Sequence, residues 1–158
     1  MGPGPGEGSC TVAVNPTAES IEEIVGVAGT PEDGPIVMIN LNRFRERADY
    51  GPNPPEGLDV EVSGEEAYAR YGAVGAAAVA ATGGRLLWSA PVASVVIGDP
   101  DDSYHQVLAV WYPSRAAFLK LGDHPGYLDA TIHRNAALEK ASILCCPAGD
   151  PESLGNPG

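Results

Sequence analysis

The pattern of apolar and polar positions divides the chain into helices and strands. Residues 35–45 begin as an apolar, β-branched run, which is typical of a strand covered on both faces. Residues 63–66 read Ser-Gly-Glu-Glu, a capping box that begins a helix running to about Thr82 before two glycines. The remaining pattern predicts three further helices, which are a short one after residues 15–17 and two over 114–121 and 123–138. It also predicts a strand over 105–112 and a short strand over 143–146. Residues 86–97 form either one strand bent near Pro91 or two short strands.

In chain order these elements give an extra N-terminal helix followed by β-α-β-β-α-β. That order is the split-βαβ, ferredoxin-like unit, an α+β fold with a four-stranded antiparallel sheet. Helices on one side leave the other side of such a sheet to be covered. Because the predicted strands are apolar on both faces, we expect a homodimer in which a second copy covers the bare side.

The two ends differ in composition from the rest of the chain. Residues 1–11 and 148–158 are rich in glycine, proline and acidic residues, so we expect disordered tails around one domain over 12–147. Within the domain, residues 45–63 read as a long loop. Loops of this length in a domain of this size are commonly a lid or a partner contact.

The charge of the chain excludes several kinds of partner. The formal net charge is −12, with nine Lys and Arg against 21 Asp and Glu, so nucleic acid and membrane surfaces are not expected to bind. No apolar run approaches the roughly 20 residues that span a bilayer, and the first residues lack the features of a signal peptide.

Three cysteines are too few for a disulfide framework. The adjacent pair Cys145 and Cys146 is interpreted as two small buried hydrophobic residues. We therefore expect a reduced, cytoplasmic protein.

Two amides interrupt the first strand at period-2 spacing. Asn40 and Asn42 point to the same face, and a buried amide is costly unless protein or ligand atoms bond to it. With Arg43 they could hold a carboxylate, phenolate or enolate oxygen, since arginine supplies a rigid fork of donors. Alternatively, the amides bond to loop backbone and Arg43 pairs with a surface acid.

The last long helix carries a second candidate group, His133 and Arg134. Asp129 lies four residues before His133, so a carboxylate could orient the imidazole as a general base. An exposed Asp–His pair of little energetic value is the competing interpretation.

Tyr68 lies on the first long helix beside two glycines, Gly72 and Gly75. Each glycine costs roughly 1 kcal/mol relative to alanine, so either the helix packs closely on the sheet or a ligand occupies the space beside Tyr68. Trp88 and Trp111 on neighbouring strands are candidates for the aromatic walls of a pocket, or for core and dimer packing.

No metal or cofactor is expected. The three histidines lack ligand spacing, no C-x-x-C motif is present, and the glycine pairs match neither a P-loop nor a dinucleotide fingerprint.

Three motifs together resemble a known family. They are Met-Ile-Asn-Leu-Asn-Arg-Phe at 38–44, Tyr-Pro-Ser-Arg-Ala-Ala-Phe at 112–118, and His133-Arg134 before a C-terminal strand. Over residues 12–147 the chain resembles a bacterial family of unknown function in the dimeric α/β-barrel superfamily. The resemblance implies a pocket in each subunit between sheet and helices. It does not imply the chemistry, because relatives include cofactor-free monooxygenases, polyketide cyclases, lactone isomerases, dehalogenation-type enzymes and haem proteins.

These features predict a cofactor-independent isomerase, cyclase, lyase or monooxygenase that transfers protons on a small, apolar, oxygen-bearing metabolite. In this hypothesis Arg43 and Asn40 polarise a substrate oxygen, and His133 or Tyr68 moves the proton. The residues expected to bind substrate are Asn42, Trp88, Trp111 and Arg134. The alternative is a non-catalytic homodimer that binds a small molecule or serves as an accessory protein.

Overall fold

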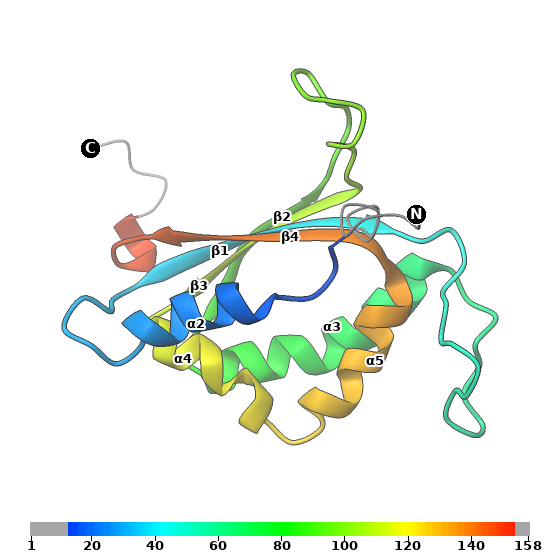
Figure 1. Ribbon diagram of the computed structural model, residues 1–158, viewed down its shortest axis with the longest axis horizontal. Coiled ribbons are helices and arrows are strands. Elements are labelled where there is room, and N and C mark those ends of the chain that lie inside the picture. Colours follow the sequence, from blue (N-terminus) through cyan, green and yellow to red (C-terminus); the bar gives the residue numbers. More distant parts are fainter. Residues whose placement is uncertain (1–12, 154–158) are drawn as a thin grey trace, which may run out of the picture.

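Four antiparallel strands form one sheet in the order β2-β3-β1-β4, and helices α2 to α5 lie against one of its faces (Figure 1). The structure is a computed structural model, and it describes residues 13–153. The strands are β1 (Ile36–Phe44), β2 (Arg85–Pro91), β3 (Gln106–Tyr112) and β4 (Leu138–Pro147). The helices are α2 (Ala18–Val27), α3 (Gly64–Ala81), α4 (Arg115–Leu119) and α5 (Tyr127–Ala137), with 3₁₀ turns η1 (Lys120–Asp123) and η2 (Pro151–Ser153). The predicted α+β, ferredoxin-like fold with an extra N-terminal helix is confirmed.

Side-chain caps fix where three of the helices begin. Ser63 Oγ accepts a hydrogen bond from Glu66 N at 3.0 Å, as the 63–66 motif predicts. Ser114 Oγ accepts one from Ala117 N, also at 3.0 Å. Thr17 and Ser20 form a reciprocal capping box at the start of α2. Each cap satisfies a backbone N–H that the helix itself leaves unpaired.

Two strands differ in length from their predicted bounds. β2 ends at Pro91, and residues 92–105 form a loop that projects away from the helices (Figure 1). Proline lacks the N–H that a strand interior needs, so the apolar residues after Pro91 do not continue the strand. β4 begins at Leu138, immediately after α5, and pairs with β1 at an edge of the sheet.

The alternation of side chains along β1 separates two apolar layers. Ile36 and Met38 point toward the helices and pack with Ala78, Tyr112 and Leu121. Residues one position later point to the opposite face, which we call the outer face of the sheet. There a buried cluster contains Val37, Ala109 and Trp111, with Ile39 and Leu87 packed against it.

The interpretation of Cys145 and Cys146 as buried hydrophobic residues is wrong. Both are exposed free thiols. They lie in the last part of β4, where residues 143–147 are all exposed.

Residues 1–11, expected to be disordered, lie outside the described part of the chain, as do the last five residues. Residues 148–153 are placed, and Gly149 O accepts a hydrogen bond from Trp111 Nε1 at 2.9 Å. Within residues 13–153, no helix has the length and apolar character that crossing a membrane requires.

Candidate functional site

A cavity of about 1390 Å³ lies between the helices and the face of the sheet that they cover. Side chains of β1 and β3 form its floor, and side chains of α2, α3, α4 and α5 form its walls. It is large enough to enclose a small metabolite. The residues that line it and matter most below are Met38, Asn40, Tyr68, Tyr71, Gly72, Val79, Gln106, Phe118, Leu121, Tyr127 and Arg134.

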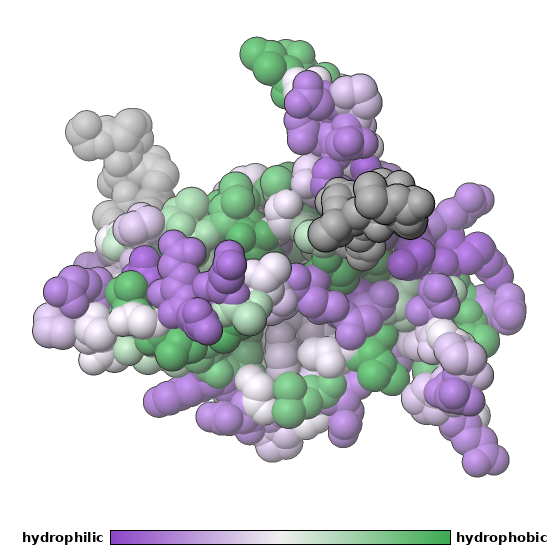
Figure 2. Space-filling view, viewed as in Figure 1, coloured by the Kyte–Doolittle hydropathy of each residue, from purple (hydrophilic) through white to green (hydrophobic). Residues whose placement is uncertain are grey.

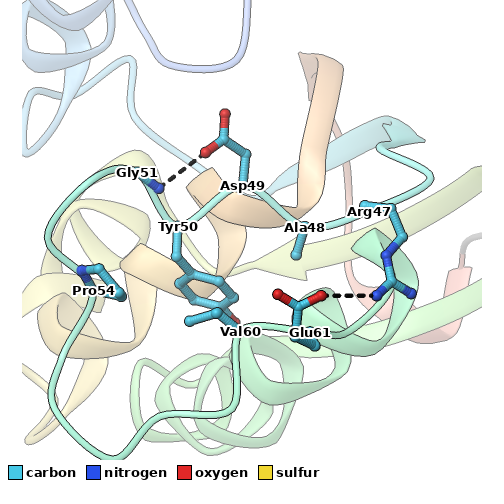
Figure 3. Close-up of a pocket in the computed structure, with 8 residues that line it drawn as sticks. All are labelled: Arg47, Ala48, Asp49, Tyr50, Gly51, Pro54, Val60 and Glu61. Carbon is cyan, nitrogen blue, oxygen red and sulfur yellow. Dashed lines mark hydrogen bonds and ion pairs between the residues drawn. The ribbon is translucent and has the colours of Figure 1, made fainter.

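A second, smaller pocket of about 390 Å³ lies within the loop over residues 47–61 (Figure 3). Its polar groups satisfy one another: Gly51 N donates to Asp49 Oδ1 at 2.9 Å, and Arg47 pairs with Glu61 at 3.2 Å. Because these groups are already paired and the pocket is formed by one loop, we place the candidate site in the larger cavity.

Three of the residues predicted from the sequence line this cavity: Asn40, Tyr68 and Arg134. Asn40 Nδ2 donates to the carbonyl oxygen of Met38 on its own strand at 3.1 Å. No described residue donates a hydrogen bond to Asn40 Oδ1, so that oxygen can accept a hydrogen bond from a ligand.

Asn42 is 1% exposed and does not line the cavity. Its Nδ2 donates to Gln106 Oε1 at 3.2 Å on the neighbouring strand. Burial raises the pKa of Tyr68, and a hydrogen bond with Asn42 offsets part of that rise. The protein itself therefore satisfies the second amide. Asn42 supports Tyr68 and Gln106, which do line the cavity.

Three tyrosines that contact one another line the cavity: Tyr68, Tyr71 and Tyr127. The ring centroids of Tyr68 and Tyr71 are 5.4 Å apart, and Tyr71 Oη lies 2.8 Å from Tyr127 Oη. Burial raises the pKa of both Tyr68 and Tyr71, although the charge of Arg134 opposes the shift. Both hydroxyls are consequently protonated at neutral pH and act as hydrogen-bond donors. We call Asn40, Tyr68, Tyr71, Tyr127 and Arg134 the polar cluster.

The sequence did not point to Tyr71 or Tyr127 as site residues. Tyr71 lies one helical turn after Tyr68, so the 3.6-residue period was a signal for it. Tyr127 begins α5, and only the packing of α5 against α3 brings its hydroxyl to Tyr71.

The two glycines in α3 leave part of the cavity open. A Cβ atom at Gly72 would meet nothing within 4 Å, and one at Gly75 would lie 3.6 Å from the Tyr71 ring. Close packing of α3 on the sheet therefore does not explain Gly72. The structure favours the other interpretation, in which missing side chains leave room beside Tyr68.

Four other predicted residues do not line the cavity. Arg43 lies one position from Asn42, so its side chain points to the outer face; its Nε pairs with Glu139 Oε2 at 3.2 Å and Nη1 donates to Ser103 O. Trp111 is buried on the outer face, and Trp88 is 52% exposed. The fourth is His133. None of these four residues lines the cavity in which the polar cluster lies.

His133 takes part in a hydrogen-bond chain with the 45–63 loop. His133 Nδ1 lies 2.7 Å from Tyr50 Oη, which also accepts from Arg70 Nη1 at 3.0 Å. Desolvation and then the charge of Arg70 lower the pKa of His133, so the imidazole is neutral at pH 7. Among the described residues, no hydrogen bond or ion pair joins His133 to Asp129. The 45–63 loop, for which a lid or a partner contact was expected, is thus hydrogen-bonded to both α3 and α5.

Within residues 13–153, no group of three or more His, Cys, Asp or Glu side chains is arranged to hold a metal ion. The cavity lining has one carboxylate, Glu23, and no histidine. Its chemistry therefore rests on amide, phenol and guanidinium groups.

Solved structures show the same fold. A crystal structure of the methylated RPA0582 protein is 33% identical to this chain, with a TM-score of 0.75, and the match covers 89% of this chain and 98% of that one. A second structure of RPA0582, described as a protein of unknown function from Rhodopseudomonas palustris, is 31% identical, with a TM-score of 0.74 and coverage of 89% and 100%.

A comparison with proteins of curated function gives no match. The model of a family named DUF1330, a domain of unknown function, matches residues 58–146, which is more than half of the chain. The resemblance to a family of unknown function with a ferredoxin-like fold is thereby confirmed. The chain belongs to the DUF1330 family.

Proposed function

We propose that the cavity binds a small, largely apolar metabolite, and that the chain acts on it as a cofactor-independent enzyme. One observation carries the proposal: the polar cluster faces an otherwise largely apolar cavity between helices and sheet. Pockets of this kind, with a few convergent polar groups in an apolar lining, are typical of small-molecule sites.

The polar cluster suits reactions in which negative charge develops on an oxygen atom of the substrate. Neutral tyrosine hydroxyls and a guanidinium stabilise an enolate or phenolate oxygen by donating hydrogen bonds in a site of low dielectric. Tyr68 is the candidate hydrogen-bond donor to that oxygen, and the proton lost from the substrate carbon would pass to solvent water. Isomerases, cyclases and lyases that pass through an enolate fit this arrangement.

A non-catalytic binding protein is the second candidate. The observation that favours it is the position of His133, which bonds to Tyr50 outside the cavity and so does not supply a base to it. Turnover separates the two candidates, whereas ligand binding in the cavity is common to both.

Binding in the cavity can be tested with a thermal-shift and calorimetry screen of phenols, lactones and polyketide-like compounds. Gly72→Phe places a ring in the open space and is expected to abolish binding. Tyr68→Phe removes one hydroxyl and is expected to weaken binding roughly fivefold. Tyr104→Phe, at a tyrosine that does not itself line the cavity, is the control and should bind as the wild type does. Hits that survive Gly72→Phe unchanged would place the ligand elsewhere.

The outer face of the sheet supports our further proposal of a homodimer. Trp88 and Leu144 are 52% and 53% exposed there, beside the buried cluster around Trp111. The projecting loop carries Val96 and Ile97 at 89% and 95% exposure. Figure 2 shows hydrophobic residues over the sheet and at the tip of this loop. Apolar surface of this kind typically marks a protein interface.

A change of charge on the outer face is expected to dissociate the dimer. Leu144→Glu should shift the mass measured by light scattering from two chains to one, because an ionised carboxylate is costly to bury at the interface. Leu128→Glu is the matched control, since Leu128 is 66% exposed on α5, at the helical face. A wild-type protein that is monomeric at micromolar concentration would contradict the proposal.

A further inference from the structure

We propose that the ligand of the cavity is an amphipathic carboxylic acid whose carboxylate binds Arg134 and whose hydrocarbon part lies at the Met38 end. The inference rests on the proposed binding function of the cavity and specifies the class of molecule bound. Three observations support it: the separation of polar and apolar lining, the pairing of the arginines, and the net charge.

The lining changes from apolar to polar along β1. At one end, Met38 packs with Leu121 and Tyr112, and partly buried side chains surround them: Ile24, Val79, Val110, Phe118 and Tyr127. Tyr127 joins the two regions, since its ring packs here and its hydroxyl lies 2.8 Å from Tyr71 Oη. At the other end, Tyr68 packs against the cluster around Leu138 and Ala141, and Ala141 is the cross-strand partner of Asn42. Asn42 lies four residues after Met38 on β1, a span of about 13 Å. A ligand that fits both ends has an apolar body and a polar head.

Three arginines line the cavity, and their partners differ. Arg115 pairs with Asp33 at 3.7 Å, and Arg85 pairs with Glu152 at 3.3 Å. The partner of Arg134 is a neutral amide: its Nη1 donates to Asn15 Oδ1 at 3.3 Å. No carboxylate among the described residues neutralises the Arg134 guanidinium, which leaves its charge available to a ligand.

The surroundings of Arg134 favour a carboxylate. A guanidinium presents parallel N–H groups that match the two oxygens of a carboxylate. The neutral hydroxyls of Tyr68 and Tyr71 lie within the electrostatic reach of Arg134 and can donate further hydrogen bonds. The one carboxylate among the described lining residues is Glu23, which lies on α2 rather than on α5 beside Arg134.

The negative net charge of the chain strengthens the argument that Arg134 selects an anionic ligand. A formal charge of −12 repels anions from the surface in general, so long-range attraction does not select an acidic ligand. Selection of an anion has to come from a local group. Arg134 is such a group, since it lies in the cavity and lacks an acidic partner.

The test compares octanoate with 1-octanol, two probes that differ in the head group, by calorimetry on the full chain. Octanoate is expected to bind the wild type about tenfold more tightly than octanol, because hydrogen bonds to charged groups exceed neutral ones in strength. Arg134→Gln should remove this preference. Arg85→Gln, at a lining arginine that has an acidic partner, should retain it. Arg134→Lys keeps the positive charge and should keep part of the preference.

The outcomes separate this inference from the proposed function. If octanol binds as tightly as octanoate and Arg134→Gln changes neither affinity, the proposal of a carboxylic acid ligand is wrong. The proposal of binding in the cavity then still stands. If neither probe binds but phenols or lactones do, the ligand class is again wrong and the site remains. If neither the probes nor the screen compounds bind, both proposals fail. Circular dichroism and thermal unfolding of Arg134→Gln and Arg134→Lys establish that each variant is folded before binding is compared.

Discussion

Replacing Gly64 by alanine is expected to lower the free energy of unfolding by about 3 kcal/mol, the upper part of the range for overpacking. An added Cβ would overlap the carbonyl oxygen of Arg45 and lie 2.7 Å from Ala137 O. Both are backbone atoms, so no side chain can move aside. Gly64 N also donates to Arg45 O at 3.0 Å, and Arg45 N donates to Ala137 O at 2.8 Å. The substitution therefore separates the start of α3 from the end of α5.

Gly72→Ala is the matched control on the same helix. Nothing lies within 4 Å of the added atom, and alanine is the better helix former, so this variant should be more stable by up to about 1 kcal/mol. Urea denaturation followed by circular dichroism measures both changes. Equal midpoints for wild type and Gly64→Ala would show that the backbone at this junction relaxes freely.

Replacing Asp33 by alanine is expected to cost about 2–3 kcal/mol, since a buried charged acceptor with several hydrogen bonds is lost. The Asp33 side chain is 4% exposed. Its Oδ1 accepts from Arg115 N at 2.8 Å, and its Oδ2 accepts from Ala116 N at 3.1 Å and from Gly29 N at 2.9 Å. Alanine leaves these three N–H groups and the Arg115 guanidinium without their acceptor.

The contribution of Asp33 should also depend on pH. Desolvation by burial raises the pKa of Asp33, but hydrogen bonds from the backbone N–H groups of Gly29, Arg115, Ala116 and Gly34 outweigh it and leave the pKa below the ordinary 3.8. A carboxyl whose pKa is lower when folded stabilises the protein above the unfolded pKa. That stabilisation is lost as the pH falls below 3.8 toward the folded pKa.

Chemical denaturation of wild type and Asp33→Ala from pH 7 to pH 3 measures this dependence. The difference in unfolding free energy should be constant at neutral pH and should shrink below pH 4. Glu32→Ala is the control, because Glu32 is an exposed acid next to Asp33 and should change stability little. A difference that is absent at pH 7, or that persists unchanged in acid, contradicts the proposed role of Asp33.

Local sequence signals predicted the fold well, because they act over a few residues. The capping serine at 63 and the apolar period of strand β1 both correspond to observed elements. Apolar residues after Pro91 have the composition of a strand but no partner strand, so β2 is shorter than predicted. Whether a residue finds a partner depends on the whole sheet, which a local pattern does not contain.

The candidate site was predicted in part. Asn40 and Arg43 differ by three positions on a strand, so the period of 2 places them on opposite faces, and only Asn40 lines the cavity. His133 and Arg134 are neighbours on a helix and point about 100° apart; His133 bonds to Tyr50, while Arg134 lines the cavity. Tyr127 depends on the packing of α5 against α3, which no local spacing reveals.

Helix α5 passes into strand β4 without an intervening loop, since α5 ends at Ala137 and β4 begins at Leu138. Leu138 is 0% exposed, and Ala137 O accepts a hydrogen bond from Arg45 N. Close packing and this hydrogen bond therefore restrict movement of the backbone at the junction. Arg134 lies one turn before this junction, and Leu144 lies six residues after it. We therefore expect a rotation of α5 at the cavity to displace β4 as well, because no flexible segment separates the two elements.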